Sequence, residues 1–297
     1  MLFSVIVPTY NGGQRLERAV HSVLAQSCQD VEIIIVDDGS TDTTPQVIEE
    51  LVAAARGRVH SLRQDNRGPG AARNQGVELS CGRYLLFLDD DDELQPGALA
   101  RFAQELEHNP GVDFLWAGHY SRDEEGRVKK HGRPPFADNK LDNFLGYIRG
   151  RFGLSQGEGV MRREIFARLR YPETIRNNED LVFFAQILAL YNCRALDDYV
   201  VTIHKRRASC RHNIDSIKAT CAVIADLLFD AAILPTACMA YKEEFRSSRY
   251  LSLCRALYYA GRYQEARTVY KEAIRIHPAH LRRWSFLSKY LRAWLAW

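Results

Sequence analysis

The sequence predicts an α/β fold in which a mostly parallel sheet with flanking helices is followed by an α-helical module. Over the first 117 residues, short runs of apolar and β-branched residues alternate with stretches whose apolar residues recur at helical spacing. After about residue 213 the β-branched runs stop and only helical spacing remains. Strands that alternate with helices imply parallel pairing with both faces of the sheet covered. We therefore expect two domains, residues 1–212 and residues 213–297.

The apolar runs and the periodic stretches define the expected elements in chain order. Strands are expected at 4–7, 31–36, 59–62, 84–88, 112–116 and 199–203. Helices are expected at 16–24, from Pro45 to about 52, and at 71–79, 96–107, 143–151 and 177–191. Residues 118–142 are charged and have no period, which predicts a loop. In such sheets ligands bind beyond the carboxyl ends of the strands, so the polar clusters at those ends form the candidate site.

Composition excludes several classes of protein. The 40 Lys and Arg against 37 Asp and Glu give a net charge of +3, too small to favour nucleic acid as a partner. No apolar run approaches the roughly 20 residues that span a bilayer, and the first residues lack the pattern of a signal peptide. The seven cysteines are irregularly spaced without a C-x-x-C pair, as expected for reduced thiols. We therefore expect a cytoplasmic protein.

An acidic run follows the expected strand at 84–88. Four adjacent carboxylates, Asp89 to Asp92, repel one another, and a divalent cation removes that conflict. Alternation along an extended chain puts Asp89 and Asp91 on one face, where oxygen ligands suit Mg²⁺ or Mn²⁺. The alternative is an acidic start to the next helix, which accounts for the later acids but not for the first two. A calcium loop does not fit, because Leu94 stands where that loop needs glycine.

Polar residues also follow the first two expected strands. Asp37 and Asp38 end the second strand, and Thr9 and Tyr10 end the first. Carboxylates there can accept hydrogen bonds from a base or a ribose hydroxyl, although Asp-Gly-Ser is also common in plain turns. A Gly/Pro loop at 66–74 follows, in which small residues permit close backbone approach and Arg73 offers a cationic fork.

These motifs together resemble family 2 glycosyltransferases over about residues 1–210. The resemblance rests on Pro8-Thr9-Tyr10-Asn11, Val36 to Asp42, Asn66-x-Gly68 with Ala72-Arg73-Asn74, and Phe87-Leu88-Asp89-x-Asp91-Asp92. It implies the GT-A fold and transfer of a sugar, with inversion, from a nucleotide-diphosphate donor, expected to be a UDP-sugar. It also implies nucleotide contacts at Pro8, Thr9, Tyr10, Asp37, Asp38, Gly68, Arg73, Asp89 and Asp90. Asp89 and Asp91 resemble the D-x-D motif that holds Mg²⁺ or Mn²⁺ on the diphosphate, although the common form has Ser in place of Asp90.

A second acidic pair stands at the start of the expected helix 177–191. Glu179-Asp180 resembles the family's Glu-Asp pair, which implies that Asp180 is the general base and Glu179 a supporting or acceptor-binding acid. The alternative is ordinary helix capping by Asn178, with acids in the first turn.

Two further segments resemble parts of the family's site. Gly157 to Phe166 resembles the segment on the acceptor side, although a turn before a helix explains it equally well. His204 is a candidate third metal ligand, and Lys205, Arg206 and Arg207 are candidates for a loop over the diphosphate. A solvated basic loop is the alternative for these four residues.

The helical tail carries two patterns. Gly261, Tyr263, Ala266, Tyr270, Ala273 and Pro278 have the offsets of one tetratricopeptide repeat, which must pack on flanking helices because a lone repeat cannot bury its face. In the last helix Trp284, Leu287, Leu291 and Trp294 share a stripe, with basic residues opposite. Such a stripe packs in a helical stack or a dimer, or lies on an anionic membrane.

The resulting hypothesis is a metal-dependent glycosyltransferase that acts on a glycan or lipid-linked acceptor, in bacterial surface polysaccharide or lipopolysaccharide synthesis. We expect it in the cytoplasm, either free or attached peripherally at the inner face of the cytoplasmic membrane. A nucleotidyltransferase is the first alternative, but residues 8–13 lack the lysine of a phosphate loop. A non-catalytic sugar-nucleotide-binding scaffold is the second, but it predicts damaged acids, and Asp89, Asp91 and Asp180 are all present.

Overall fold

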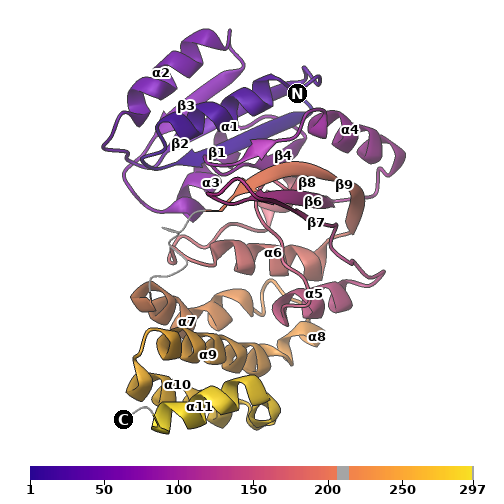
Figure 1. Ribbon diagram of the computed structural model, residues 1–297. Coiled ribbons are helices and arrows are strands. Elements are labelled where there is room, and N and C mark those ends of the chain that lie inside the picture. Colours follow the sequence, from indigo (N-terminus) through magenta and orange to yellow (C-terminus); the bar gives the residue numbers. More distant parts are fainter. Residues whose placement is uncertain (206–213, 296–297) are drawn as a thin grey trace.

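The computed structural model describes residues 1–205 and 214–295. A mixed sheet with its flanking helices forms the upper part in Figure 1, and layers of helices lie below it. This arrangement confirms the α/β class and the helical C-terminal part.

The N-terminal half of the sheet is parallel. It contains β1 (Phe3–Thr9), β2 (Val31–Asp37), β3 (Val59–Arg63) and β4 (Tyr84–Phe87) in the spatial order β3-β2-β1-β4. The connecting helices are α1 (Gln14–Leu24), α2 (Thr44–Ala54), α3 (Pro69–Leu79) and α4 (Ala98–His108). All eight elements agree with the ranges expected from the apolar runs within a few residues.

The second half of the sheet mixes both directions. β8 (Gly159–Arg162) is antiparallel to β4, and β6 (Phe114–Arg122) is antiparallel to β8. β9 (Cys193–His204) runs parallel to β6, and the two-residue β5 (Glu93–Leu94) pairs with β9. The edge strand β7 (Val128–His131) pairs with β6.

Three of these features differ from the sequence expectation. Residues 118–142 were expected to be a loop, but they contain the end of β6 and all of β7. Because the side chains of β7 are mostly exposed, no apolar alternation marks it. The four-residue β8 is too short to have a visible period, and β9 begins six residues before the expected 199–203.

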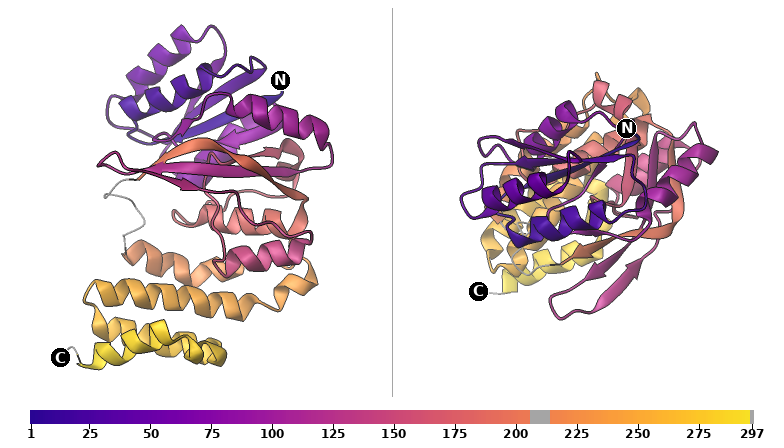
Figure 2. Two further views of the ribbon diagram at one scale, coloured as in Figure 1. Left: turned by 45° about the vertical axis from the view of Figure 1, so that its right-hand side comes forward. Right: turned by 90° about the horizontal axis from the view of Figure 1, so that it is seen from above.

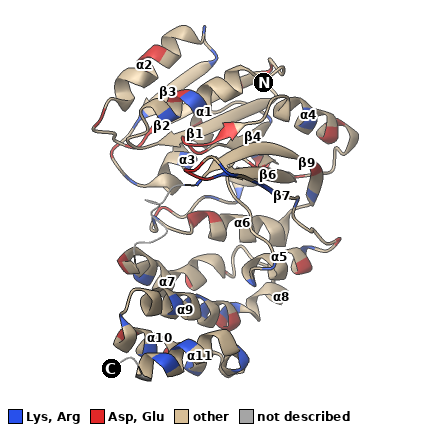
Figure 3. Ribbon diagram, viewed as in Figure 1, with Lys and Arg blue, Asp and Glu red and all other residues tan. Residues whose placement is uncertain are grey.

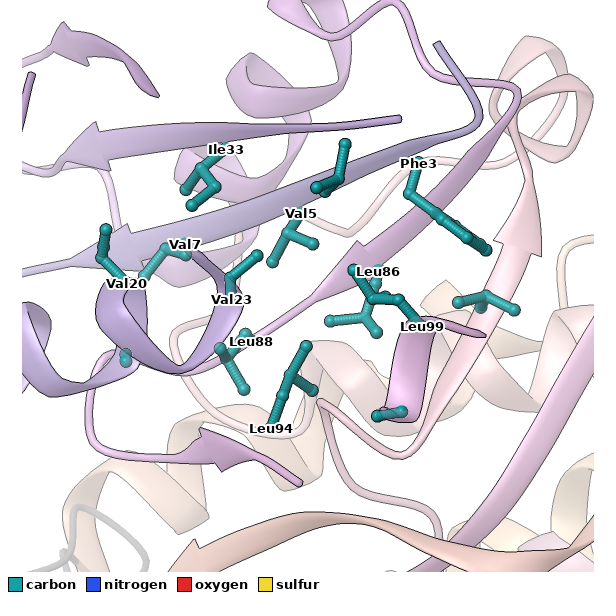
Figure 4. Packing of buried hydrophobic residues seen from close by; sticks show 14 of the residues in the cluster. Phe3, Val5, Val7, Val20, Val23, Ile33, Leu86, Leu88, Leu94 and Leu99 are labelled. Atoms are coloured by element: carbon teal, nitrogen blue, oxygen red, sulfur yellow. The ribbon is translucent and has the colours of Figure 1, made fainter. Parts of the chain in front are cut away.

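The core lies on both faces of the sheet, because β1, β2 and β4 are buried throughout. Val5 and Val7 pack with α1, α2 and α4 on one face, as the close view in Figure 4 shows for the α1 and α4 contacts. Ile6 points to the other face, where it packs with α3 and with α6 (Glu179–Leu190).

The remaining helices are stacked beneath the sheet, as the left view of Figure 2 shows. They are α5 (Lys140–Ile148), η1 (Arg163–Ala167), α7 (Ile214–Leu228), α8 (Thr236–Met239), α9 (Lys242–Tyr259), α10 (Tyr263–Ile276), η3 (Pro278–Arg282) and α11 (Trp284–Leu295). One apolar cluster joins α5 and α6 to α7 and α9 through Phe144, Val182, Leu228 and Phe245. The domain boundary expected at residue 212 lies outside the described residues and stays a prediction.

The last three helices form the end of the stack. α9 and α10 form a hairpin whose turn contains Gly261 at a φ of 74°, and Tyr270 and Ala273 are buried inside it. This is the helical hairpin expected of a repeat, and its assignment as a tetratricopeptide unit stays a prediction. On α11 the side chains of Trp284 and Trp294 are 69% and 53% exposed. Within the described residues, no helix has the length and apolar character needed to cross a bilayer.

Candidate functional site

The carboxyl ends of β1, β2, β4, β6 and β9 lie at one edge of the sheet. The strand pairing fixes this arrangement. β1, β2 and β4 are parallel, and β6 runs in the same direction because β8 is antiparallel to both β4 and β6. The predicted acids therefore lie along this edge, and Arg73 links Asp89 to the first turn of α6. Acidic segments gather at this edge in Figure 3 (red).

The acidic run after β4 is a tightly packed cluster. The Thr9 hydroxyl donates to Asp90 Oδ2 at 2.6 Å, and the His204 amide donates to Asp92 Oδ1 at 2.9 Å. Burial, opposed by that Thr9 bond and aided by the charge of Asp91, raises the pKa of Asp90 to about 6. Burial and the charges of Asp89 and Asp91 raise the pKa of Asp92 well above its usual value. Burial and repulsion within the cluster thus oppose the charged forms of Asp90 and Asp92.

Arg73 joins this cluster to the second acidic pair. It lies on α3 with a 5% exposed side chain; Nη2 donates to Asp89 Oδ1 at 2.9 Å and Nη1 to Glu179 Oε1 at 2.6 Å. Its guanidinium also lies over the Tyr171 ring, 5.3 Å from the centroid. Burial opposes the charge of Arg73, but the charges of Asp89 and Glu179 outweigh burial and raise its pKa. One side chain therefore connects residues that are 90 positions apart in the chain.

Asp180 occupies the first turn of α6 beside Glu179. Burial and the charge of Glu179 raise its pKa to about 6, which is close to the value that suits a base working near neutral pH. The preceding Asn178 has a left-handed φ of 61° and its side chain makes no capping hydrogen bond. The side chain of Asn178 therefore does not cap α6, contrary to the capping alternative.

The two acids at the end of β2, Asp37 and Asp38, accept hydrogen bonds from neighbouring loops. Asp38 is 5% exposed; its Oδ1 accepts from Gln64 Nε2 at 2.7 Å and from the Arg67 amide at 2.8 Å, and its Oδ2 accepts from the Gly68 amide at 2.8 Å. Asp37 accepts from the Ser40 amide at 2.8 Å. These bonds shape the loop at Gly68, whose φ of 94° favours glycine. Nucleotide contacts by these residues stay predictions.

The first strand ends in a crowded corner. Pro8 is buried, whereas the Tyr10 side chain is 48% exposed at the edge of the sheet. A Cβ on Gly12 would lie 2.2 Å from Thr9 Oγ1 and 2.5 Å from Asp90 Oδ2, so a glycine is needed beside that pair. Because the Tyr10 ring is exposed, it is available to stack on a flat ligand.

The basic segment after β9 is only partly described. His204 Nε2 lies 2.7 Å from Glu93 Oε1, and Arg18 pairs with the same carboxylate. Lys205 is exposed, and Arg206 and Arg207 lie outside the described residues. Within the described part of the chain, no three His, Cys, Asp or Glu side chains form a metal-binding group by themselves. A cation here would depend on a ligand that supplies further oxygens.

Two residues of this region, Glu158 and Tyr147, were not among the candidates taken from the sequence. Glu158 is 3% exposed between two glycines and binds the Trp116 indole and His119 Nδ1, the latter at 2.6 Å. Tyr147 is a neighbour of both Glu158 and Asp180, whose charges, after burial, raise its pKa well above the usual value. Glu158 lies in the segment that resembles the acceptor side, but only the folded chain shows its partners and brings Tyr147 near it.

A separate hollow lies at the opposite edge of the sheet. It is lined by the β7–α5 connection, the first half of α5 and Tyr191 to Ala195, which include the first residues of β9. Because β9 begins opposite Phe114 and ends opposite Arg122, this hollow is distant from the acids. It therefore plays no part in the candidate site.

Comparison with known proteins decides the family. The family model described as glycosyl transferase family 2 matches residues 4–170, more than half of the chain. The chain belongs to glycosyltransferase family 2. Its acidic run after β4 and all of its parallel strands β1 to β4 except Phe3 lie within the matched range.

This family 2 glycosyltransferase has relatives in several bacteria. It is 43% identical over 115 residues to the uncharacterized glycosyltransferase alr2836 of a Nostoc species, covering 39% of this chain and 36% of that protein. It is 32% identical over 181 residues to the GalNAc(5)-diNAcBac-PP-undecaprenol beta-1,3-glucosyltransferase of Campylobacter jejuni, covering 59% of this chain and 56% of that protein. The matches thus span little more than half of these relatives at most.

Solved structures share the fold over nearly the whole chain. The crystal structure of Staphylococcus aureus TarS 1–349 superposes with a TM-score of 0.68 at 21% identity, covering 99% of this chain and 90% of that one. The same protein is also solved with UDP-GlcNAc, at a TM-score of 0.65. The mannosyltransferase PcManGT of Pyrobaculum calidifontis, in complex with GDP-Man and Mn²⁺, gives 0.58 at 17% identity, covering 99% of this chain and 86% of that one. The likeness therefore includes the helices after residue 213 as well as the GT-A part.

Proposed function

We propose that this chain transfers a sugar, with inversion, from a nucleotide-diphosphate sugar to a hydroxyl of a glycan or lipid-linked acceptor in bacterial surface polysaccharide synthesis. The observation that carries the proposal is the position of Arg73. It bonds both Asp89, in the acidic run, and Glu179, beside the candidate base. Donor-side and acceptor-side chemistry therefore share one small region at the sheet edge.

The acidic run fits a divalent cation, Mn²⁺ or Mg²⁺. The raised pKa values of Asp90 and Asp92 reflect burial and mutual repulsion, which a bound cation relieves. Asp89 and Asp91 are the proposed ligands, and donor phosphates complete the set, as is usual for Mg²⁺ at phosphate sites. When bound, the cation neutralises charge on the diphosphate leaving group.

The remaining roles in the proposed reaction belong to side chains of the protein. Asp180, partly accessible in the first turn of α6, takes the proton of the acceptor hydroxyl as that hydroxyl attacks the anomeric carbon. Glu179 is held by Arg73 and places its neighbour. Tyr10 offers a ring for the base, and Lys205 lies beside the edge where departing phosphate charge needs a cation.

Two finer assignments belong to the same proposal. A UDP-sugar is favoured as donor because TarS, whose fold covers 99% of this chain, is solved with UDP-GlcNAc. Residues 273–297 contain five Lys or Arg and no Asp or Glu, and α11 exposes Trp284 and Trp294. That combination fits contact with an anionic membrane surface carrying the acceptor.

A panel of nucleotide sugars tests the proposal. Each is added to the chain with and without Mn²⁺, and the unfolding temperature and the slow hydrolysis of the donor are measured. A true donor at 100 times its dissociation constant stabilises the fold by about 2.7 kcal/mol. Asp91→Ala is expected to abolish the Mn²⁺-dependent part of both signals. If no nucleotide sugar shifts the unfolding temperature, or if Asp91→Ala behaves as the wild type does, the donor and metal assignments are wrong.

A further inference from the structure

Two of the C-terminal helices α7 to α11, called the helical module from here on, contact the turn that precedes the candidate base. Asn177 Nδ2 donates to Ser216 Oγ of α7 at 2.6 Å, and Arg249 Nη2 of α9 donates to Asn178 Oδ1 at 3.3 Å. Ser216 and Arg249 belong to different helices of the module, yet they reach two consecutive residues. The next residues along the chain are Glu179 and Asp180.

Arg249 is an unusual residue to find at this place. It is partly buried, and within the described residues no carboxylate forms an ion pair with it. Burial lowers its pKa, while the nearby Cys221, Tyr147 and Asp180 act in the opposite direction. A partly buried arginine whose hydrogen-bond partner is a neutral amide stabilises the fold little, because desolvation opposes it. Its presence needs a reason other than fold stability.

The conformation of Asn178 gives that reason. Its φ of 61° costs free energy for a residue with a side chain, and its side chain does not cap α6. Besides the helical bond from the Val182 amide to the Asn178 carbonyl, the turn is held by the two contacts with the module. Such a turn sets where the first residues of α6 stand relative to Arg73 and the sheet edge.

We propose that Arg249 and Ser216 are positioning residues: through Asn178 and Asn177 they fix the first turn of α6, and so the place of Glu179 and Asp180. The proposal rests on the function proposed above only for the naming of Asp180 as the base. It assigns the helical module a part in catalysis, in addition to any contact with acceptor or membrane. Displacing a catalytic group by about 1 Å can lower a rate by up to about a hundredfold.

The first experiment measures the turn itself and needs no substrate. Hydrogen–deuterium exchange of the full chain is followed by mass spectrometry for peptides covering residues 176–183, in Arg249→Met, Ser216→Ala and a control. The control is Arg246→Met, which removes an arginine from the same helix one turn earlier and breaks surface ion pairs with Asp226 and Glu243. Faster exchange is expected in the first two variants only. Equal exchange in Arg249→Met and Arg246→Met overturns the proposal, whether or not the chain proves to be a transferase.

The second experiment measures catalysis, with UDP-GlcNAc and Mn²⁺ as the first probe and the best donor of the panel thereafter. Arg249→Met is expected to lower kcat by about tenfold or more, with the KM for the donor within about twofold of wild type. Arg246→Met is expected to leave both unchanged. An equal fall in the two variants would show a general loss of stability instead of positioning.

Asn178→Gly separates positioning from stability. Glycine adopts a positive φ without strain, so this variant is expected to unfold at the wild-type temperature or above it. It also loses the acceptor for Arg249, so kcat is expected to fall as in Arg249→Met. The double variant is expected to fall no further than either single variant. Additive losses, or an unchanged kcat in Asn178→Gly, would contradict the coupling.

Discussion

Replacing Asp180 by Asn is expected to stabilise the protein and to abolish transfer. The carboxylate is crowded by burial and by Glu179, which raise its pKa from 3.8 to about 6. That rise corresponds to about 3 kcal/mol of free energy that opposes folding with the group ionised. Solvent reaches part of the carboxylate, so we expect the neutral amide to stabilise the fold by about 1–3 kcal/mol at pH 7.5.

The sign of the pH dependence follows from the same values. An unfolded Asp binds its proton below about pH 4, whereas folded Asp180 binds it below about pH 6. Between these values the native state holds more protons than the unfolded chain, so wild-type stability falls as pH rises. The advantage of Asp180→Asn is therefore fully present above about pH 6, shrinks between 6 and 4, and is lost below.

Thermal unfolding at pH 7.5 and pH 4.5 measures this difference. The control is Asp138→Asn, an exposed acid at the opposite side of the sheet. A rise of about 2–6 °C is expected at the higher pH, with little left at the lower pH. Transfer is expected to fall by about 10²–10⁴-fold, because the amide cannot take a proton. If Asp180→Asn matches Asp138→Asn in stability at both pH values, burial does not disfavour the charge. If transfer persists within a few-fold, Asp180 is not the base.

Two further substitutions test the donor side. Gly12→Ala places a methyl group 2.2 Å from Thr9 Oγ1 and 2.5 Å from Asp90 Oδ2. We therefore expect a loss of about 1–3 kcal/mol of stability, and weaker nucleotide-sugar binding measured by calorimetry. Wild-type values for both would show that the residues around Gly12 can move apart to accept the methyl group. Arg73→Lys keeps the charge but loses the fork that reaches two carboxylates, so kcat is expected to fall by at least about tenfold and the unfolding temperature by several degrees; a lysine variant with full activity would show that the bridge is not needed.

The sequence was enough to predict which edge of the sheet carries the acids, because that inference needs only the order and direction of the strands. Runs such as 31–36 are buried on both faces, so they stand out as continuous apolar segments, and parallel strands deliver their carboxyl ends to one edge. Acids that follow such runs must then lie at that edge. Asp37 and Asp89 are accordingly expected at the same edge, at the ends of the two strands that flank β1.

Other contacts could not have been predicted from the same patterns. Arg73 and Glu179 are 106 residues apart and belong to helices on the same face of the sheet, a relation that no local spacing encodes. The edge strand β7 is mostly exposed, so it lacks the alternation that identifies a strand. Arg249 lies in a helix whose pattern resembles a repeat, and only the fold brings it to Asn178.

The helix that carries the candidate base is buried from two sides, and this explains why the helical module belongs to the site. Phe183, Phe184 and Ile187 of α6 pack under the sheet, whereas Val182 and Ala185 pack with the module. A helix that is apolar on all sides is buried, so its position depends on how both neighbouring layers pack against it. The first turn is its polar end, and there too the sheet side supplies Arg73 and the module supplies Arg249. A change in how the module packs is therefore expected to move Asp180 relative to Asp89, even though the module contains none of the family's motifs.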